Sequence, residues 1–380
     1  MPPDAAQQFG QWFVSPSPAT YDSLVSYGMP ARTQDSLANA AETKFAGASG
    51  KFTIVLPDTF GSRYTIGWKT PAHIRHDTLY PLIVYLHGGT GTSLTTKGEI
   101  AWDMLSALGD TFNILLASPS ADRLNPWWSP AGLSRMLQTV RFMTLCYPVN
   151  PDKIFLAGVS DGAAGCYAAA NAICGPFAGF IAVSGYGGML SQLGMNLYPG
   201  NIMQRPILNI NAGKDRIYPI EEVRKFLDWL GANGVSVERK EYPDENHGFD
   251  YRDKEYGHLA QFIRTWSRPG NGRSVSWTFV RGFPNCPDNL LSWNVLPEAQ
   301  EQAVTAYWTN DTLQVRTAGI RSAALTFNGK VPQKAYARVN GTAPRGLSAL
   351  VPDAALLLGL TRHGMFPRLS QQTVYSLKVP

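Results

Sequence analysis

Apolar runs separated by polar, glycine-containing turns recur along residues 51–266 of the chain. The run at residues 80–86 is apolar throughout, as expected of a strand buried on both faces of a parallel sheet. Segments with helical spacing lie between such runs, and this alternation predicts a mostly parallel sheet covered by helices on both faces. The predicted strands are residues 51–57, 64–70, 80–86, 112–118, 154–157, 179–184, 207–212 and 236–242, and the predicted helices are residues 131–147, 163–172, 220–231 and 254–266.

The alternation ends at a loop containing proline and glycine, residues 267–272. Beyond it lie only short strand-like runs, separated by turn signals such as Asn328 and Asn340, each followed by glycine. About seven short strands in roughly 110 residues predict a small β-sandwich. These strands are residues 274–281, 303–308, 313–317, 323–327, 336–339, 355–361 and 373–379. We therefore expect an N-terminal segment (1–48) that packs on an α/β domain (49–269), and a β-sandwich-like accessory domain (273–380).

The most specific pattern lies between residues 153 and 172. An apolar run leads into Gly158-Val-Ser160-Asp-Gly162, and an alanine-rich helical run follows. A G-x-S-x-G between a strand and a helix holds the serine at the tip of a sharp turn with its hydroxyl exposed. The positions two residues to either side must be small, because strand and helix nearly touch there. The motif also arises by chance, but its flanking elements favour Ser160 as a nucleophile.

A serine hydroxyl needs a base to take its proton, and the base needs a group to orient it. In the strand-turn-helix context of this motif, the order along the chain is serine, acid, histidine. Asp215 directly follows the strand at residues 207–212, and His247 follows the last predicted strand. We therefore assign Asp215 as the acid and His247 as the base, with Asp244 as the alternative acid.

Acyl transfer at a serine also needs two N–H donors for the oxyanion. One is expected to be the backbone N–H of Asp161, directly after the nucleophile. The second is expected from Gly88, Gly89 or Thr90, in the loop that ends the strand at residues 80–86. A Gly-Gly pair after a strand is also compatible with an ordinary tight turn, but its pairing with the serine motif favours the functional interpretation.

Together, His87-Gly-Gly-Thr-Gly91, the serine motif, Gly213-Lys-Asp215 and Asn246-His-Gly248 resemble the α/β-hydrolase superfamily. More narrowly, they resemble bacterial esterases of the feruloyl/acetylxylan-esterase and polyhydroxybutyrate-depolymerase type, which share features with the prolyl oligopeptidase catalytic domain. The resemblance covers about residues 50–268. It implies an α/β-hydrolase fold and serine-dependent hydrolysis of a small-molecule or polysaccharide-linked ester, without a cofactor.

Two other functions remain open. A serine peptidase of the prolyl oligopeptidase type would have the same catalytic motifs, but only about 80 residues precede the oxyanion loop, too few for a β-propeller. A hydrolase fold that has lost catalysis and serves as a binding module is disfavoured, because all four motifs are intact.

Substrate contacts are predicted for Trp127 and Trp128, in a loop that follows a sheet strand, because ligands bind beyond the carboxyl ends of such strands. One of the two indoles could instead be core, while the other offers a flat face to a sugar or aromatic ring. Met189, Leu190 and Leu193 could line the acyl side or simply pack a helix. Only about 20 residues separate the strands at 179–184 and 207–212, which predicts an open cleft without a cap domain.

Composition narrows the function classes further. The chain is 44% hydrophobic and 16% charged, so it can build a sizeable core. Its net charge of +5 is spread without any run of Lys or Arg, which argues against nucleic acid as a partner. The N-terminus has no signal-peptide pattern, and no apolar run is long enough to span a bilayer. The low charge content leans toward an exported, periplasmic or extracellular, mature protein.

Cysteine and histidine spacings give no metal signal. The four cysteines form no C-x-x-C pair, and we expect buried thiols, with a Cys166–Cys174 disulfide as the alternative. His73 and His76 have an H-x-x-H spacing without further ligands nearby, which favours an exposed loop over a metal site. We expect no metal.

Overall fold

The computed structural model describes residues 48–379 apart from positions 76, 93, 95, 270–271, 273, 328–333, 348 and 351–372. Segment 1–47, and with it the predicted packing of the N-terminal segment, lies outside the described residues. The chain divides into two compact units, and each is treated separately below. The first holds the described residues up to Arg268 together with Gly282–Pro284, and the second holds Pro269–Arg281 and the described residues from Asn285 onward.

The first unit is built on an eight-stranded sheet with the order β1-β2-β4-β3-β5-β6-β7-β8. All neighbours from β4 to β8 pair in parallel, whereas β1 and β2 add an antiparallel edge. The predicted mostly parallel sheet is therefore confirmed. The strands are β1 Lys51–Pro57, β2 Arg63–Lys69, β3 Tyr80–Leu86, β4 Leu115–Pro119, β5 Val149–Val159, β6 Gly179–Val183, β7 Ile207–Ala212 and β8 Val237–Tyr242.

Burial along the strands follows their position in the sheet. Central strands β4, β6 and β7 are buried at every position, because helices cover both faces. Edge strand β1 alternates between exposed and half-buried side chains, as its sequence alternates between polar and apolar residues over much of its length. The continuous apolar runs thus mark the centre of the sheet, where the site described below is formed.

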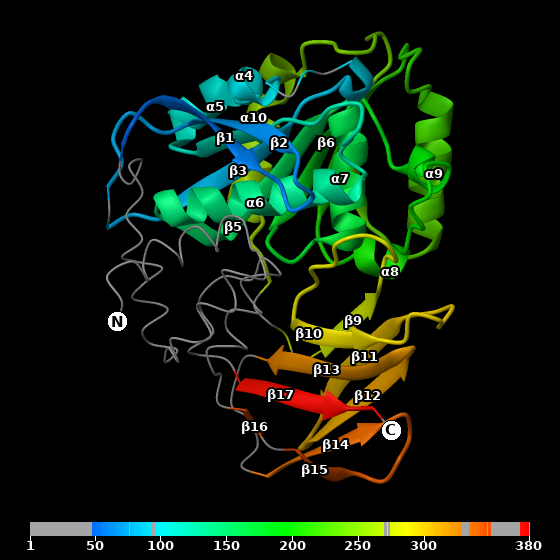
Figure 1. Ribbon diagram of the computed structural model, residues 1–380. Helices are drawn as coiled ribbons and strands as arrows, with labels where there is room; N and C mark the ends of the chain where they lie inside the picture. Colours follow the sequence, from blue (N-terminus) through cyan, green and yellow to red (C-terminus); the bar gives the residue numbers. More distant parts are fainter. Residues whose placement is uncertain are drawn as a thin grey trace. The chain divides into compact units, whose positions relative to one another are not determined.

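Helices cover the two faces of this sheet, as Figure 1 shows. On one face, the buried side chains of α5 and α10 form a core with strand residues such as Ile83 and Tyr85. On the other, α6 and α7 pack on β3 and β5, and α9 packs beside β8. The helices are α4 Gly98–Ala101, α5 Ser106–Phe112, α6 Pro130–Cys146, α7 Asp161–Ala172, α8 Pro199–Ile202, α9 Ile220–Ala232 and α10 Tyr251–Thr265.

The predicted strand at residues 112–118 begins too early. Phe112 is the last residue of α5, and its ring lies 5.8 Å from that of Tyr256 on α10. Asn113 then adopts a left-handed conformation with φ of 53°, which ends the helix, and the strand starts only at Leu115. Asparagine tolerates that conformation better than most residues, so Asn113 was the signal for the boundary.

The described residues of the second unit form two β-sheets, as predicted, with the orders β10-β13-β17-β16 and β15-β14-β12-β11-β9. Trp308 of the five-stranded sheet contacts Phe327 and Tyr375 of the four-stranded sheet, so the sheets pack face to face. The strands are β9 Ser274–Thr278, β10 Leu290–Val295, β11 Ala303–Thr309, β12 Thr312–Ala318, β13 Ile320–Phe327, β14 Ala335–Val339, β15 Arg345–Leu347, β16 Ala349–Leu350 and β17 Thr373–Lys378.

Three of these strands, β10, β15 and β16, were not predicted. Strand β10 contains two register shifts against β13, which interrupt the alternation that makes a strand recognisable. Strands β15 and β16 are only three and two residues long. The predicted strand at residues 355–361 lies outside the described residues.

Candidate active site

Ser160 stands at the turn between β5 and α7 in a backbone conformation that is rare for serine, with φ of 58° and ψ of −120°. Its N–H donates to the carbonyl of Val183 at 2.9 Å, which ties the turn to β6. A Cβ at Gly158 would lie 2.2 Å from the carbonyl oxygen of Gly162, and one at Gly162 would lie equally close to that of Leu86. Only glycine fits at either position, as the motif required.

The structure brings Ser160, His247 and Asp215 together at the carboxyl edge of the sheet. His247 Nε2 lies 3.1 Å from Ser160 Oγ, and His247 Nδ1 lies 2.7 Å from Asp215 Oδ2. The other oxygen of Asp215 accepts the N–H groups of Ile217 and Tyr218, each at 2.8 Å. The Asp215 side chain is buried and the imidazole is 21% exposed, so a fixed carboxylate orients a histidine that reaches the surface.

Asp244, the alternative acid, lies elsewhere. Its carboxylate is almost fully exposed and pairs with Lys214 at 2.9 Å. The hydrogen bond and charge of that lysine lower the pKa of Asp244 below its usual value. The carboxylate that contacts His247 is that of Asp215.

Two predicted oxyanion donors border Ser160. A Cβ at Gly88 would lie 2.9 Å from Ser160 Cβ, so the backbone of Gly88 runs directly beside the serine. Asp161 is the first residue of the 12-residue helix α7, where backbone N–H groups have no acceptor within the helix. Gly89, next to Gly88, has φ of +65°, a conformation that favours glycine.

The assignment of Thr90 as a donor to the oxyanion is wrong. Its backbone N–H and its hydroxyl both donate to Oδ2 of Asp161, at 2.7 and 2.8 Å. A donor already bound to a carboxylate cannot at the same time face the serine. Thr90 instead anchors the loop that carries Gly88 and Gly89.

His87 stabilises the same loop through hydrogen bonds to backbone groups. Its Nε2 accepts the N–H of Ala121 at 3.1 Å, which leaves Nδ1 to donate to the carbonyl of Gly88 at 3.0 Å. Lys97 Nζ donates to the same carbonyl at 2.6 Å. Burial lowers the pKa of His87 from its ordinary 6.5 to about 4, so the imidazole is neutral near neutral pH.

The prediction that Trp127 contacts substrate is also wrong. The side chain is fully buried, and its Nε1 donates to the carbonyl of His87 at 2.8 Å. The indole packs edge-on against the His87 ring, with centroids 5.0 Å apart. Trp127 therefore supports the oxyanion loop from the core, whereas Trp128 is half-buried.

The three residues suggested for the acyl side differ in their burial and contacts. Leu190 is fully buried and packs the core, whereas Leu193 is 46% exposed. Met189 lies near the site, because its Sδ is 3.5 Å from the hydroxyl oxygen of Tyr218. Of the three, only Met189 is tied by a contact to the residues around His247.

Tyr218 and the carboxylate of Asp161 form a connection that the sequence interpretation missed. The Tyr218 hydroxyl donates to Asp161 Oδ1 at 2.9 Å, while its ring stacks on His247 with centroids 5.9 Å apart. Burial, followed by the charge of Asp161, raises the pKa of Tyr218, so the phenol keeps its proton and remains a donor. Asp161 thus links the oxyanion loop, through Thr90, to the loop that presents Asp215.

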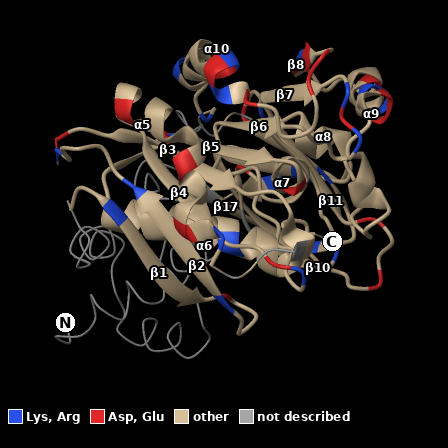
Figure 2. Ribbon diagram, turned by 90° about the horizontal axis from the view of Figure 1, so that it is seen from above, with Lys and Arg blue, Asp and Glu red and all other residues tan. Residues whose placement is uncertain are grey.

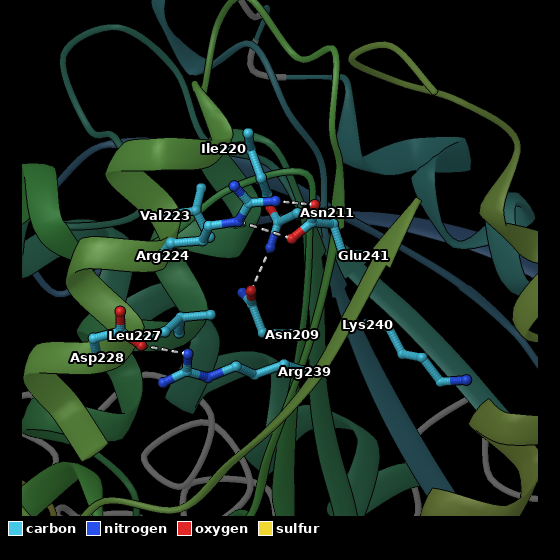
Figure 3. Close-up of a pocket in the computed structure, with 10 residues that line it drawn as sticks. All are labelled: Asn209, Asn211, Ile220, Val223, Arg224, Leu227, Asp228, Arg239, Lys240 and Glu241. Carbon is cyan, nitrogen blue, oxygen red and sulfur yellow. Dashed lines mark hydrogen bonds and ion pairs between the residues drawn. The ribbon is translucent and has the colours of Figure 1, made fainter. Parts of the chain in front are cut away.

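A cavity of about 250 Å³ lies under α9, against β7 and β8 (Figure 3). Four charged side chains that line it form two ion pairs, Arg224 with Glu241 and Arg239 with Asp228. The amides of Asn209 and Asn211 hydrogen-bond each other and the backbone of Gly185. A Cβ at Gly185 would lie 2.7 Å from the Ser160 carbonyl oxygen. The two asparagines therefore hold Gly185 in place against the backbone of the serine turn.

Other sequence expectations concern metals, membranes and disulfides. Among the described residues, no group of three or more His, Cys, Asp or Glu side chains is arranged to hold a metal ion. His73 is exposed, and His76 lies outside the described residues. Within the described part of the chain, every helix is too short or too polar to cross a bilayer. All four cysteines, Cys166 and Cys174 included, are buried thiols that form no disulfide.

The sheet order, the serine turn after β5, and the aspartate and histidine after β7 and β8 define the α/β-hydrolase fold, so the resemblance to that superfamily is confirmed. The model of the Dienelactone hydrolase family matches residues 124–269 of the chain. Among curated proteins, none matches this chain.

Many solved structures resemble this chain. A thermostable esterase is 19% identical with a TM-score of 0.45, and the match covers 57% of this chain but 63%, less than two thirds, of the esterase. A ferulic acid esterase is 15% identical with a TM-score of 0.44, covering 57% of this chain and 98% of its own. A poly(3-hydroxybutyrate) depolymerase from Bordetella parapertussis is 11% identical with a TM-score of 0.46, covering 56% and 89%. None of these likenesses identifies the substrate of this chain.

Proposed function

We propose that this protein is a serine carboxylic ester hydrolase that acts through an acyl-enzyme. The observation that carries the proposal is the hydrogen-bonded series Asp215–His247–Ser160, with spacings of 2.7 and 3.1 Å, at the turn between β5 and α7. These distances are within the reach that general base catalysis needs. The backbone of Gly88 and the N–H of Asp161 lie beside that hydroxyl, where an oxyanion would form.

In the first half of the reaction, His247 Nε2 takes the proton of Ser160 as Oγ attacks the ester carbonyl carbon. The carbonyl oxygen becomes an oxyanion that accepts the N–H of Asp161 and one from the Gly88–Gly89 segment. Asp215 stabilises the imidazolium through Nδ1–H. The imidazolium then gives its proton to the leaving alkoxide oxygen, the carbon–oxygen bond breaks, and the alcohol departs, leaving the acyl group on Ser160.

In the second half, a water molecule takes the place of the alcohol. His247 removes a proton from the water as its oxygen attacks the acyl carbon, and the oxyanion forms again at the same donors. The proton then returns to Ser160 Oγ as the carboxylic acid is released. The residues on the two loops and at the serine turn supply every proton transfer, so the cycle consumes only ester and water.

We further propose acyl or feruloyl esters of polysaccharides as the substrates. Residues 184–206, between β6 and β7, contain only two one-turn elements, η3 Gly188–Ser191 and α8 Pro199–Ile202. A stretch this short lacks the residues for a separate cap domain that would enclose a long acyl chain. The shortness of this stretch favours an ester carried on a bulky scaffold over one with a long, enclosed acyl chain.

A substrate panel combined with active-site labelling tests the proposal. We expect turnover of 4-nitrophenyl acetate, acetylated xylo-oligosaccharides and feruloyl esters, with much less for long-chain acyl esters and for peptide amides. Ser160→Ala should lower kcat by roughly four to six orders of magnitude without changing the unfolding midpoint, because no core volume is lost. Preferred cleavage of peptide amides would favour the peptidase alternative, and a fluorophosphonate adduct on a residue other than Ser160 would contradict the assignment.

A further inference from the structure

An open groove of about 300 Å³ lies between η3 and α9, outside the site described above. Three aromatic side chains form its wall, and polar side chains form its rim. The aromatic residues are Tyr186, Phe226 and Trp229, and the polar ones include Gln192, Glu222 and Lys225.

The aromatic wall presents one flat, fixed face to solvent. Trp229 is 40% exposed and stacks on the buried ring of Phe226, with centroids 5.9 Å apart and planes inclined by 28°. Tyr186 also packs edge-on against Phe226, with ring centroids 5.7 Å apart. Because the indole is held by its neighbours, a ligand that stacks on it does not have to bear the cost of ordering a free side chain.

The rim is polar but carries little net charge. Glu222 and Lys225 pair with each other at 2.7 Å, and the exposed Gln192 adds an amide with donors and acceptors. Figure 2 shows acidic and basic residues interspersed along α9 rather than gathered by sign. An apolar chain laid across this rim would strip water from the ion pair without replacing its hydrogen bonds. A neutral ligand rich in hydroxyl groups would satisfy the rim.

The groove adjoins the catalytic residues. Tyr186 packs edge-on against Tyr218, with ring centroids 5.9 Å apart, and Tyr218 in turn stacks on His247. Tyr186 also directly follows Gly185, which abuts the backbone of Ser160. A substrate with its ester carbonyl at Ser160 can therefore extend past Tyr186 onto the indole of Trp229.

We propose that this groove is a carbohydrate subsite that binds a sugar unit of the ester substrate some distance from the bond that is cleaved. A pyranose ring offers an apolar face of C–H groups for the indole and equatorial hydroxyls for the rim. This inference rests on the proposed esterase function and adds to it the part of the substrate that the enzyme recognises and where it does so.

The test compares a glycosyl ester with an ester too small to reach the groove. In Trp229→Ala, kcat/KM for an acetylated xylo-oligosaccharide should fall about threefold to tenfold more than kcat/KM for 4-nitrophenyl acetate, mainly through KM. Trp229→Phe should recover part of the loss, because a flat ring remains. Trp266→Ala is the matched control, since Trp266 is 42% exposed on α10's C-terminal side and is not a groove residue. Trp266→Ala should change kcat/KM for neither ester.

Equal losses on both esters, or no loss on the glycosyl ester, would overturn the subsite. Calorimetric titration of Ser160→Ala with unesterified xylohexaose gives a second measurement that does not depend on turnover. Binding should weaken when Trp229→Ala is added and stay unchanged when Trp266→Ala is added. If the wild-type protein cleaves no ester, the proposed function fails, while this titration still decides whether the groove binds sugar.

Discussion

Two loops at the same edge of the sheet each carry a histidine, and the two histidines have opposite environments. His87, at the end of β3, is 3% exposed, and both of its ring nitrogens bind backbone groups. His247, after β8, is 21% exposed at its side chain and lies between a carboxylate and a hydroxyl. The first imidazole holds a loop in shape, whereas the second has one nitrogen facing a group that can give it a proton.

The comparison shows that position at the carboxyl edge does not make a histidine catalytic. A base must present an unprotonated nitrogen to the nucleophile, and this depends on what the other nitrogen binds. In His247, the Asp215 carboxylate accepts from Nδ1 and so leaves Nε2 free of its proton and directed at Ser160. In His87, the Nε2 lone pair is already used by the N–H of Ala121.

Among substitutions of the groups that surround Ser160, the largest expected effect is that of Asp215→Asn. Oδ1 of Asp215 accepts two backbone N–H groups, so the amide of an asparagine would turn its NH₂ toward His247. Nδ1 would then have to accept, Nε2 would carry the proton, and the imidazole could not deprotonate Ser160. We expect kcat to fall by roughly 10⁴-fold, measured with 4-nitrophenyl acetate.

Asp244→Asn is the matched control for that substitution, because the exposed Asp244 pairs only with Lys214 on the surface. Its kcat should stay within about twofold of the wild-type value. A larger loss in Asp244→Asn than in Asp215→Asn would show that the orienting carboxylate has been assigned wrongly.

The second prediction concerns the pH dependence of stability through His87. The pKa of this residue is about 4 in the folded protein, below its ordinary 6.5. The unfolded chain therefore takes up the proton at a higher pH than the folded protein does. The resulting contribution to the free energy of unfolding is complete above about pH 6.5 and is lost, by roughly 3 kcal/mol, as the pH falls toward 4.

Urea unfolding at several pH values between 7.5 and 4 measures this contribution. His87→Asn removes the titrating group, so its free energy of unfolding should vary less steeply with pH than that of the wild type. His73→Asn serves as the control, since His73 is exposed, and should retain the wild-type slope. An unchanged slope in His87→Asn would mean that protonation of the buried imidazole does not cause the loss of stability at low pH.

A smaller effect on kcat than that of Asp215→Asn is expected for Asp161→Ala, which removes the acceptor shared by the two loops. Thr90 and the buried Tyr218 hydroxyl would lose their common partner, and the oxyanion loop would lose its tie to the loop of Asp215. We expect kcat to fall about tenfold to hundredfold, with KM less affected. Tyr218→Phe, which removes one of the three hydrogen bonds, should lie between this variant and the wild type.

Active-site titration with a fluorophosphonate separates positioning from folding in these variants. A positioning role lowers kcat per folded molecule and slows the labelling of Ser160. If Asp161→Ala loses activity only in proportion to its unfolded fraction, or keeps the wild-type kcat, the link between the loops has no catalytic consequence.

The class of fold and the residues that meet beside Ser160 could both be predicted from the sequence. Strands β1, β3 and β7 have the predicted bounds, because each is a local run bounded by turn residues. The serine turn is likewise a local requirement, since close approach of strand and helix excludes any Cβ at Gly158 and Gly162. Asp215 and His247 could be placed because the order of strands along the chain fixes which loops reach the serine.

The hydrogen-bond partners of the groups around this site could not be predicted from the sequence, because they depend on contacts between distant parts of the chain. The N–H of Thr90 donates to the carboxylate of Asp161, 71 residues away in the chain. The indole N–H of Trp127 donates to the carbonyl of His87, 40 residues away. Trp127 is fully buried, whereas the indole of Trp229, on the helix after β7, is 40% exposed and stacks on a neighbouring ring. Hydrophobic pattern indicates that a side chain is buried, but its hydrogen-bond partner depends on which strands become neighbours. Strands β3 and β5 lie side by side in the sheet, although more than 60 residues separate them in the chain.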